Sequence, residues 1–335
     1  VTGDCGTGYA EQLQVLNQYN LFTGNTPTNG WLLLGDNAYN GGFDSEYTTN
    51  FFTPYQGSIM KKAPLWPAPG NHDYDNNGTK QNTHAVPYYD IFNLPSQGEC
   101  GGVASNTEAF YSYDYGNIHF LALDSYGKEN NATRLYDTTG AQVQWIKNDL
   151  ATNNKPWIIA YWHHPPYTMG SHNSDTEGDL ASIRSNFIRI LERMGVDLVM
   201  CGHSHAYERT KLMKEHYGLE ATFNASTNNL INSSGKYDGT ANSCTYLKDT
   251  LHNSLKGAVY VVSGSAGKFG GTSAGYPHNA MEYSNVSNPG SVILDFDDNR
   301  LDVKWLCGDG VIRDQFTMMK NTGKLRTYTI NEGDS

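Results

Sequence analysis

The 335-residue sequence predicts a layered α/β fold, and three observations support this prediction. In the first half, apolar runs typical of buried strands alternate with the apolar spacing of helices. Polar groups follow several of these runs, as they do beyond the carboxyl ends of strands in open α/β sheets. Residues 257–320 are predicted to be nearly all strand. We therefore expect one domain, residues 1–335, with surface insertions at about 75–108 and 211–256.

The individual elements follow from the spacing of apolar residues. Trp31-Leu32-Leu33-Leu34 is a short continuous apolar run, which suits a strand covered on both faces. Leu180, Ile183 and Phe187 begin a helical spacing of apolar residues that Gly195 ends, as a C-cap would. The elements expected in chain order are the tail of a strand at 1–3 whose beginning is missing, a helix at 9–20, a strand at 31–34, a helix near 46–60, a strand at 64–69, a hairpin at 110–124, a helix around 143–150, a strand at 157–162, a helix at 179–194, and strands at 196–200, 258–263, 292–296, 301–306 and 311–317.

Composition limits the classes of function. A net charge of −11 argues against a nucleic-acid or anionic-membrane surface, because either needs a basic patch. No apolar run approaches the ~18 residues of a membrane span. Few lysines with many Gly, Asn, Ser, Thr and Tyr residues indicate a secreted or periplasmic protein. The cysteines lack a Cys-x-x-Cys pair, which disfavours a thiolate zinc site and leaves the disulfide pairing open: Cys5, Cys100, Cys201, Cys244 and Cys307.

Potential metal ligands follow five of the predicted strands. His203 and His205 are one residue apart and would share a face of an extended chain, although His-x-His alone is a weak signal. Taken singly, the aspartates and the asparagine could be turn or cap residues, and the tyrosine a packing residue. Together they offer the donors that two hard cations need, with one carboxylate between the ions: Asp4, Asp36 with Tyr39, Asn71 with His72, His163, and His203 with His205.

These motifs, in this order, resemble those of the calcineurin-like metallophosphoesterases: Asp4-x-Gly6, Gly35-Asp36-x-x-Tyr39, Gly70-Asn71-His72-Asp73, a strand ending in His163, and Gly202-His203-x-His205. The tyrosine narrows the resemblance to purple acid phosphatases, and Ala206-Tyr207-Glu208-Arg209 is similar to their plant and related bacterial branch. The resemblance implies a four-layer αββα sandwich, in which two mixed sheets are flanked by helices.

The resemblance also implies a role for each candidate ligand. Asp4, Tyr39 and His205 would bind Fe(III), because carboxylates and a phenolate are hard, anionic donors. Asn71, His163 and His203 would bind a divalent zinc, iron or manganese ion, which imidazoles and an amide suit. Asp36 would bridge the two metals. His163 is preferred to its neighbour His164 because the family pattern is His, one residue, then Pro.

The expected activity is that of a broad-specificity acid phosphatase. It would take small phosphorylated substrates and release inorganic phosphate, with a metal-activated hydroxide attacking a phosphomonoester. His72 and His172 are the candidates for protonating the leaving group or stabilising its charge, while Asp73 would orient a neighbouring group and Arg209 would form a structural pair. The alternatives are a phosphodiesterase or nucleotidase with a non-iron metal pair, and an inactive metal-binding or adhesion module. The sequence leaves the oligomeric state open.

Overall fold

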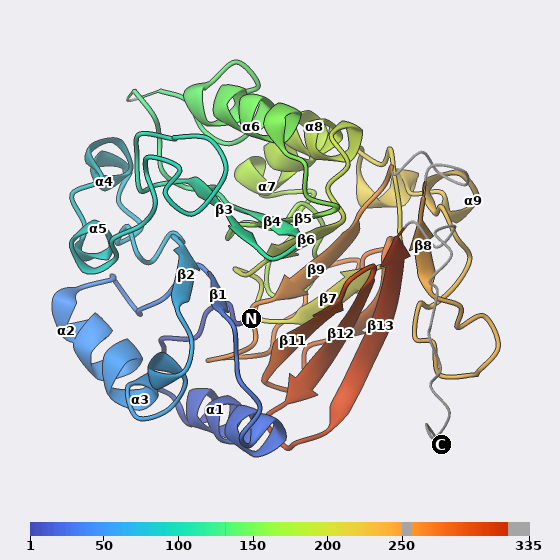
Figure 1. The fold of residues 1–335 in the computed structure, drawn as a ribbon, viewed down its shortest axis with the longest axis horizontal. Coiled ribbons are helices and arrows are strands. Elements are labelled where there is room, and N and C mark those ends of the chain that lie inside the picture. The colour runs from blue at the N-terminus through green and yellow to red at the C-terminus, as the bar shows by residue number, and fades with distance from the viewer. Residues whose placement is uncertain (131, 250–255, 321–335) are drawn as a thin grey trace, which may run out of the picture.

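The computed structural model describes residues 1–130, 132–249 and 256–320, and its largest element is a seven-stranded mixed sheet (Figure 1). The four central strands β9, β6, β5 and β4 run parallel, and antiparallel pairs extend the sheet at both edges. In spatial order the strands are β10 (Met281–Asn285), β7 (Tyr207–Thr210), β9 (Val259–Ser263), β6 (Leu198–Cys201), β5 (Trp157–Tyr161), β4 (Ile118–Ala122) and β3 (Tyr111–Tyr115).

A second, four-stranded sheet is formed mainly by the C-terminal strands. Three antiparallel strands are joined by one parallel strand, in the order β11 (Gly290–Asp297), β12 (Arg300–Cys307), β13 (Ile312–Lys320) and β8 (Tyr246–Lys248). A parallel pair, β1 (Trp31–Leu34) and β2 (Leu65–Ala68), adjoins it. Thr2 bridges to Leu33 of β1, and Val1 exchanges backbone hydrogen bonds of 2.7 and 3.0 Å with Val292 of β11. The first residues of the chain therefore connect the two smaller sheets.

Two hydrophobic cores lie on opposite faces of the seven-stranded sheet. Along β5, Trp157 and Ile159 belong to the core between the sheets, whereas Ile158 and Ala160 belong to the core under the helices. This alternation is the period of two of an extended strand. The helical core is closed by α6 (Ala141–Thr152) and by the continuous helix α7 (Gly178–Ser182), η3 (Ile183–Phe187) and α8 (Ile188–Arg193).

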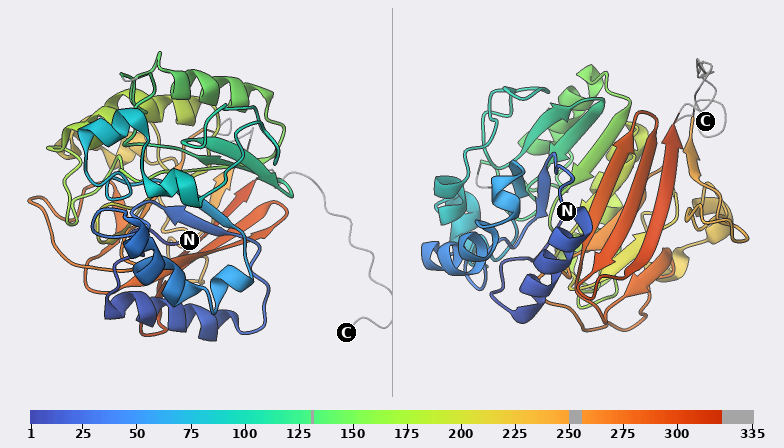
Figure 2. Two further views of the ribbon diagram at one scale, coloured as in Figure 1. Left: turned by 90° about the vertical axis from the view of Figure 1, so that its left-hand side faces the viewer. Right: turned by 60° about the horizontal axis from the view of Figure 1, so that its bottom comes forward.

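The smaller sheets have their own helical cover. Helix α1 (Ala10–Thr23) contacts β11 and β12, and Trp31 of β1 packs against Phe51 and Tyr55. Those two aromatic residues lie in the helical segment α2 (Asp44–Glu46), η1 (Tyr47–Phe52) and α3 (Thr53–Tyr55), which η2 (Ile59–Lys61) follows. Figure 2 shows the resulting stack of helices, sheet, sheet and helices from two further sides. The predicted αββα sandwich is confirmed.

Most predicted elements are present, but some differ from the prediction and two strands were not predicted. The helix expected near 46–60 is broken into the short segments above, and residues 75–108 contain α4 (Gly78–Thr83) and α5 (Pro87–Ile91). Residues 211–256 contain η4 (Glu220–Thr222), α9 (Ala225–Asn228) and β8, with 250–255 outside the described part. Strand β7 was missed because it buries Glu208 and Arg209, and β10 because all five of its residues are half-buried without alternation.

A buried ion pair links the two sheets. Arg209 of β7 donates through Nε to Asp314 Oδ2 of β13 at 2.6 Å and through a terminal nitrogen to Oδ1 at 2.9 Å. Both side chains are fully buried, and the pair is bidentate. Arg209 is therefore the structural pair that the sequence predicted.

All five cysteines, each inside the described ranges, are unpaired, and Cys5, Cys201 and Cys307 are buried. Among the described residues, no helix combines the length and the apolar character needed to cross a bilayer.

The buried His119 makes stability depend on pH. Its Nδ1 lies 2.8 Å from Asp114 Oδ1 and its Nε2 lies 2.6 Å from Asp149 Oδ2. Burial alone would lower the pKa of His119, but the hydrogen bonds and charges of Asp149 and Asp114 raise it above its ordinary value. The resulting stabilisation is complete below the unfolded-state pKa of about 6.5 and is lost as pH rises through the higher folded-state pKa.

We expect His119→Ala to lower the free energy of unfolding by about 3 kcal/mol at pH 6, because it leaves the buried Asp149 carboxylate without its positive partner. The difference from wild type should narrow at pH 9. Urea unfolding of the metal-free proteins at both pH values measures it. Asp114→Asn, which removes only the charge of the more exposed partner, should lower the free energy of unfolding by less. Equal losses for His119→Ala at pH 6 and pH 9 would contradict this interpretation.

Candidate metal centre

The candidate ligands gather beyond the carboxyl ends of strands. Asp36 follows β1, Asn71 follows β2, His163 follows β5 and His203 follows β6, while Asp4 follows the short bridge at Thr2. Three of these residues leave their strands with a left-handed backbone: φ is 58° at Asp4, 52° at Asp36 and 67° at His203. Non-glycine residues rarely adopt this conformation, and it is concentrated at functional sites.

Two aspartates share one tyrosine hydroxyl at the centre of the group. The Tyr39 hydroxyl lies 2.7 Å from Asp4 Oδ1 and 2.9 Å from Asp36 Oδ2. His205 Nε2 completes this side, 3.4 Å from the same hydroxyl and 3.6 Å from Asp4 Oδ1. Burial, followed by the charges of Asp36 and Asp4, raises the pKa of Tyr39 well above its ordinary value. Two carboxylates, a phenol and an imidazole therefore converge on this side of the site.

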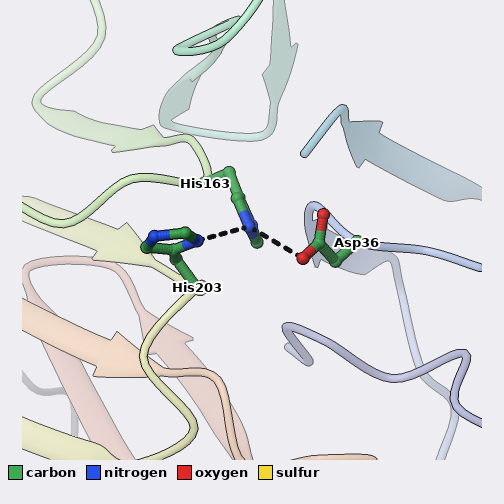
Figure 3. Close-up of side chains that lie close together, drawn as sticks. All are labelled: Asp36, His163 and His203. Carbon is green, nitrogen blue, oxygen red and sulfur yellow. Dashed lines mark hydrogen bonds and ion pairs between the residues drawn. The ribbon is translucent and has the colours of Figure 1, made fainter. Parts of the chain in front are cut away.

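Asp36 also belongs to a second group of side chains (Figure 3). His163 Nε2 lies 3.1 Å from Asp36 Oδ2, and His203 Nδ1 lies 3.2 Å from His163 Nε2. The ligand atoms of these three residues all lie within 4.8 Å of one another, close enough to share one cation. His163 donates its Nδ1 proton to the Leu34 carbonyl at 2.8 Å, which turns Nε2 toward the site.

The charges of this second group are coupled. Burial alone would raise the pKa of Asp36, yet the neighbouring His163 brings it well below its ordinary value. Burial would likewise lower the pKa of His163, but Asp36 raises it to about 9. Burial lowers the pKa of His203 to about 4. In the metal-free protein, His163 is therefore the positive partner of Asp36.

Asn71 offers a buried carbonyl oxygen that a metal ion could bind. Its side chain is 7% exposed, and its Oδ1 is buried without a hydrogen-bond partner in the described structure. Its Nδ2 instead donates to Asn76 Oδ1 at 2.7 Å. A buried carbonyl oxygen left unpaired is costly unless a ligand satisfies it. The donor set, with hard oxygens on one side and imidazoles with an amide oxygen on the other, fits two metal ions.

The two candidate catalytic histidines flank this group. The ring centroids of His72 and Tyr39 are 4.4 Å apart, and His72 Nε2 is 3.9 Å from Asp36 Oδ2. The ring of His172 lies 3.7 Å from that of His203. These contacts connect eight of the nine residues that the sequence singled out, and the ninth, Asn71, directly precedes His72 in the chain. Their roles are proposals.

Glu177 also lies at the site, although the sequence did not predict it. Its carboxylate lies 2.9 Å from His172 Nδ1 and 3.6 Å from His203 Nε2. Burial would raise the pKa of Glu177, but hydrogen bonds from these two histidines hold it well below its ordinary value. Glu177 follows His172 by five residues in a loop, and no periodic pattern there marks it.

The surrounding backbone holds the carboxylates in place. Asp4 Oδ2 accepts a hydrogen bond from the His203 backbone N–H at 2.8 Å, and Asp36 Oδ1 accepts one from that of His72, also at 2.8 Å. A Cβ at Gly202 would lie 2.6 Å from Asp4 Oδ2, and one at Gly70 would collide with Asp36. The glycine that precedes each of these two ligand motifs is therefore required by close approach.

Asp73 ties two ligand-bearing loops together. Its carboxylate accepts hydrogen bonds from Gly70 N, Asn37 N, Asn37 Nδ2 and the Tyr47 hydroxyl, at 2.6 to 3.2 Å. Burial and the charge of Asp36 raise the pKa of Asp73 to about 7. The expectation that Asp73 orients neighbouring groups agrees with these contacts.

Sequence comparison matches residues 1–207, more than half of the chain, to the calcineurin-like phosphoesterase family. Two relatives from Arabidopsis thaliana are purple acid phosphatase 23, 32% identical over 155 residues (45% of this chain and 30% of the relative), and purple acid phosphatase 15, 30% identical over 165 residues (48% and 28%). The matched part thus spans less than a third of the length of these relatives.

Structure comparison gives the same fold. A purple acid phosphatase, PPD1, from seeds of yellow lupin (Lupinus luteus) superposes with a TM-score of 0.70 at 20% identity, over 99% of this chain and 56% of that one. GAP50, the anchor in the inner membrane complex of Plasmodium, superposes with a TM-score of 0.59 at 14% identity, over 96% and 89%. At these identities the likeness concerns the fold alone.

Proposed function

We propose that this chain, which belongs to the calcineurin-like phosphoesterase family, hydrolyses phosphomonoesters at a centre of two metal ions. The observation that carries the proposal is the position of Asp36 between two groups of donors. Asp36 Oδ2 lies 2.9 Å from the Tyr39 hydroxyl on one side and 3.1 Å from His163 Nε2 on the other. A carboxylate in this position can bind two cations at once.

The donor chemistry supports a different metal on each side. Asp4, Tyr39 and His205 would hold Fe(III), since a phenolate and carboxylates are hard, anionic ligands. A divalent zinc, iron or manganese ion would be held by Asn71, His163 and His203, with Asp36 shared. Two ions in such a centre supply Lewis acidity toward a phosphoryl oxygen and make water a nucleophile at acidic pH.

The residues of the chain provide the proton for the leaving group. His72 donates its Nδ1 proton to the Asn40 carbonyl at 2.6 Å, so that Nε2 faces the centre. From there a protonated His72 gives its Nε2 proton to the departing alkoxide. His172, which Glu177 holds beside His203, is the second candidate for protonating the leaving group or stabilising its charge.

The expected substrates are small and varied. With a net charge of −11, the protein as a whole repels phosphate esters, so that the metal centre itself must attract them. We infer broad specificity for phosphomonoesters, inorganic phosphate as a product, an acidic optimum, and a secreted or periplasmic location.

Two other functions use the same scaffold. One is phosphodiester or nucleotide hydrolysis with a non-iron metal pair. The other is an inactive binding module, and one relative, 30% identical over 201 residues, carries the name probable inactive purple acid phosphatase 9. Six of the seven candidate ligands lie in one cluster, and Asn71 offers a buried Oδ1 that has no partner among the described residues. This retention favours an active centre.

Steady-state rates on a monoester and a diester test the function. The metal-loaded protein should show a higher kcat/KM for 4-nitrophenyl phosphate than for bis(4-nitrophenyl) phosphate, with an optimum below pH 7. Asp36→Ala should lose both metals and turnover, because it removes the shared ligand. A preference for the diester would contradict the proposal that the protein is a phosphomonoesterase. Less than one metal per chain, with no turnover after reconstitution, would favour the inactive module.

His72 can be tested with leaving groups of different basicity. We expect His72→Ala to reduce kcat by about 10²-fold or more on glycerol phosphate, whose alkoxide needs a proton. The loss on 4-nitrophenyl phosphate should be smaller, because 4-nitrophenolate leaves unprotonated. As a control, His84→Asn alters a histidine whose Nε2 contacts the Lys128 carbonyl and whose ring contacts Tyr74 and Tyr89, and this variant should behave as wild type. Equal losses on both substrates would argue against proton donation by His72.

The proposed role of Tyr39 as an iron ligand can be tested by visible absorption spectroscopy. A tyrosinate bound to Fe(III) absorbs visible light by charge transfer, so Tyr39→Phe should abolish a visible band of the iron-loaded protein. Tyr47→Phe is the matched control, because Tyr47 is also buried and donates to a carboxylate, Asp73, outside the donor set. The absorption spectrum is recorded together with the iron content. A colourless, fully active zinc or manganese enzyme would disprove the iron assignment alone.

A further inference from the structure

We propose that Asn76 is a positioning residue, which orients the side-chain amide of Asn71 so that Oδ1 faces the divalent metal. The inference rests on the proposed two-metal centre and assigns a role to a residue outside the seven ligands. Asn71 Nδ2 donates to Asn76 Oδ1 at 2.7 Å, while Asn71 Oδ1 is buried without a partner among the described residues. The two ends of this amide therefore have different surroundings.

The orientation of the amide decides whether Asn71 can bind a metal. The carbonyl oxygen of an asparagine can coordinate a cation, whereas its NH₂ group carries only donor hydrogens. A flipped amide would point those hydrogens at the cation. An acceptor on the far side, at Asn76 Oδ1, favours the productive orientation because it satisfies Nδ2 there. Such hydrogen bonds behind a ligand typically matter about 10–100-fold in metal affinity.

The backbone, and not side-chain packing, places Asn76. Its φ is +48° and that of Asp75 is +55°, and its own N–H donates to the Asn71 carbonyl at 2.8 Å. The next residue, Asn77, caps helix α4 by accepting a hydrogen bond from Thr79 N at 2.9 Å. Asparagine is one of the few residues that enter the left-handed region readily. Asn76 is exposed, so that replacing it removes no core contact.

The contact of Asn76 with His72 does not compete with this role. Asn76 Nδ2 lies 3.3 Å from His72 Nδ1, but that nitrogen already donates its proton to the Asn40 carbonyl at 2.6 Å. Two donors facing each other give no hydrogen bond. Asn76 is therefore assigned to the orientation of Asn71, and not to that of His72.

Zinc titration of two variants at this position tests the inference. Asn76→Gly keeps the left-handed backbone and removes the acceptor, whereas Asn76→Asp keeps an acceptor and tolerates the same backbone. Zn²⁺ is added to metal-free protein in competition with a zinc chelator of known affinity. Asn76→Gly should weaken one of the two zinc-binding steps about 10–100-fold and leave the other unchanged. Asn76→Asp should bind zinc at least as tightly as wild type.

A matched control separates backbone effects from the acceptor. Asn242 is also exposed and has a φ of +56°. Its side chain makes no hydrogen bond to the described residues. Asn242→Gly should leave both zinc-binding steps unchanged. Thermal unfolding of the metal-free Asn76 variants should match wild type.

The outcomes distinguish this inference from the proposed function. Wild-type zinc binding in two steps with an unchanged Asn76→Gly would overturn the role of Asn76 and leave the two-metal centre standing. An Asn76→Asp variant that loses as much affinity as Asn76→Gly would also overturn it, because the acceptor would then not matter. A wild-type protein that binds no zinc would overturn the proposed function together with this inference.

Discussion

The centre depends on two buried carboxylates, Asp4 and Asp36, that lie within hydrogen-bond distance of one tyrosine hydroxyl. Two negative charges so close together in a medium of low dielectric repel each other strongly, and a single hydroxyl proton cannot balance both. The protein compensates with His163 beside Asp36 and with the backbone N–H groups of His203 and His72. Metal ions between the carboxylates would complete this compensation, which is why the remaining donors gather around them.

The fold brings these donors together by ending several strands at one place. The left-handed conformations at Asp4, Asp36 and His203 turn the chain sharply after each strand, so that the side chains point inward. Asp73 then joins two of the loops, and Arg209 and Asp314 join the sheets beneath them. A scaffold that holds three candidate ligands in this rarely populated backbone conformation is the arrangement expected of a preorganised site.

The predicted layers are confirmed, whereas the metal ligands stay a prediction, made because each candidate followed an apolar strand or a glycine turn. It missed β7, whose buried Glu208 and Arg209 look like surface residues until Asp314 is seen to pair with the arginine. It also missed Glu177 and Asn76, which act through hydrogen bonds set by loop conformation. No periodicity or motif records such contacts. Contacts that support a candidate ligand from a loop are therefore beyond what the sequence predicts.

The most direct test of this account is anomalous diffraction from crystals of the metal-loaded protein, measured at the absorption edges of iron and of the divalent metal. We predict two peaks on either side of Asp36, with Tyr39 and His205 bound to iron and with Asn71, His163 and His203 bound to the second metal. A single peak ligated by both His203 and His205 would contradict the account, because the two histidines would then form one site instead of belonging to two.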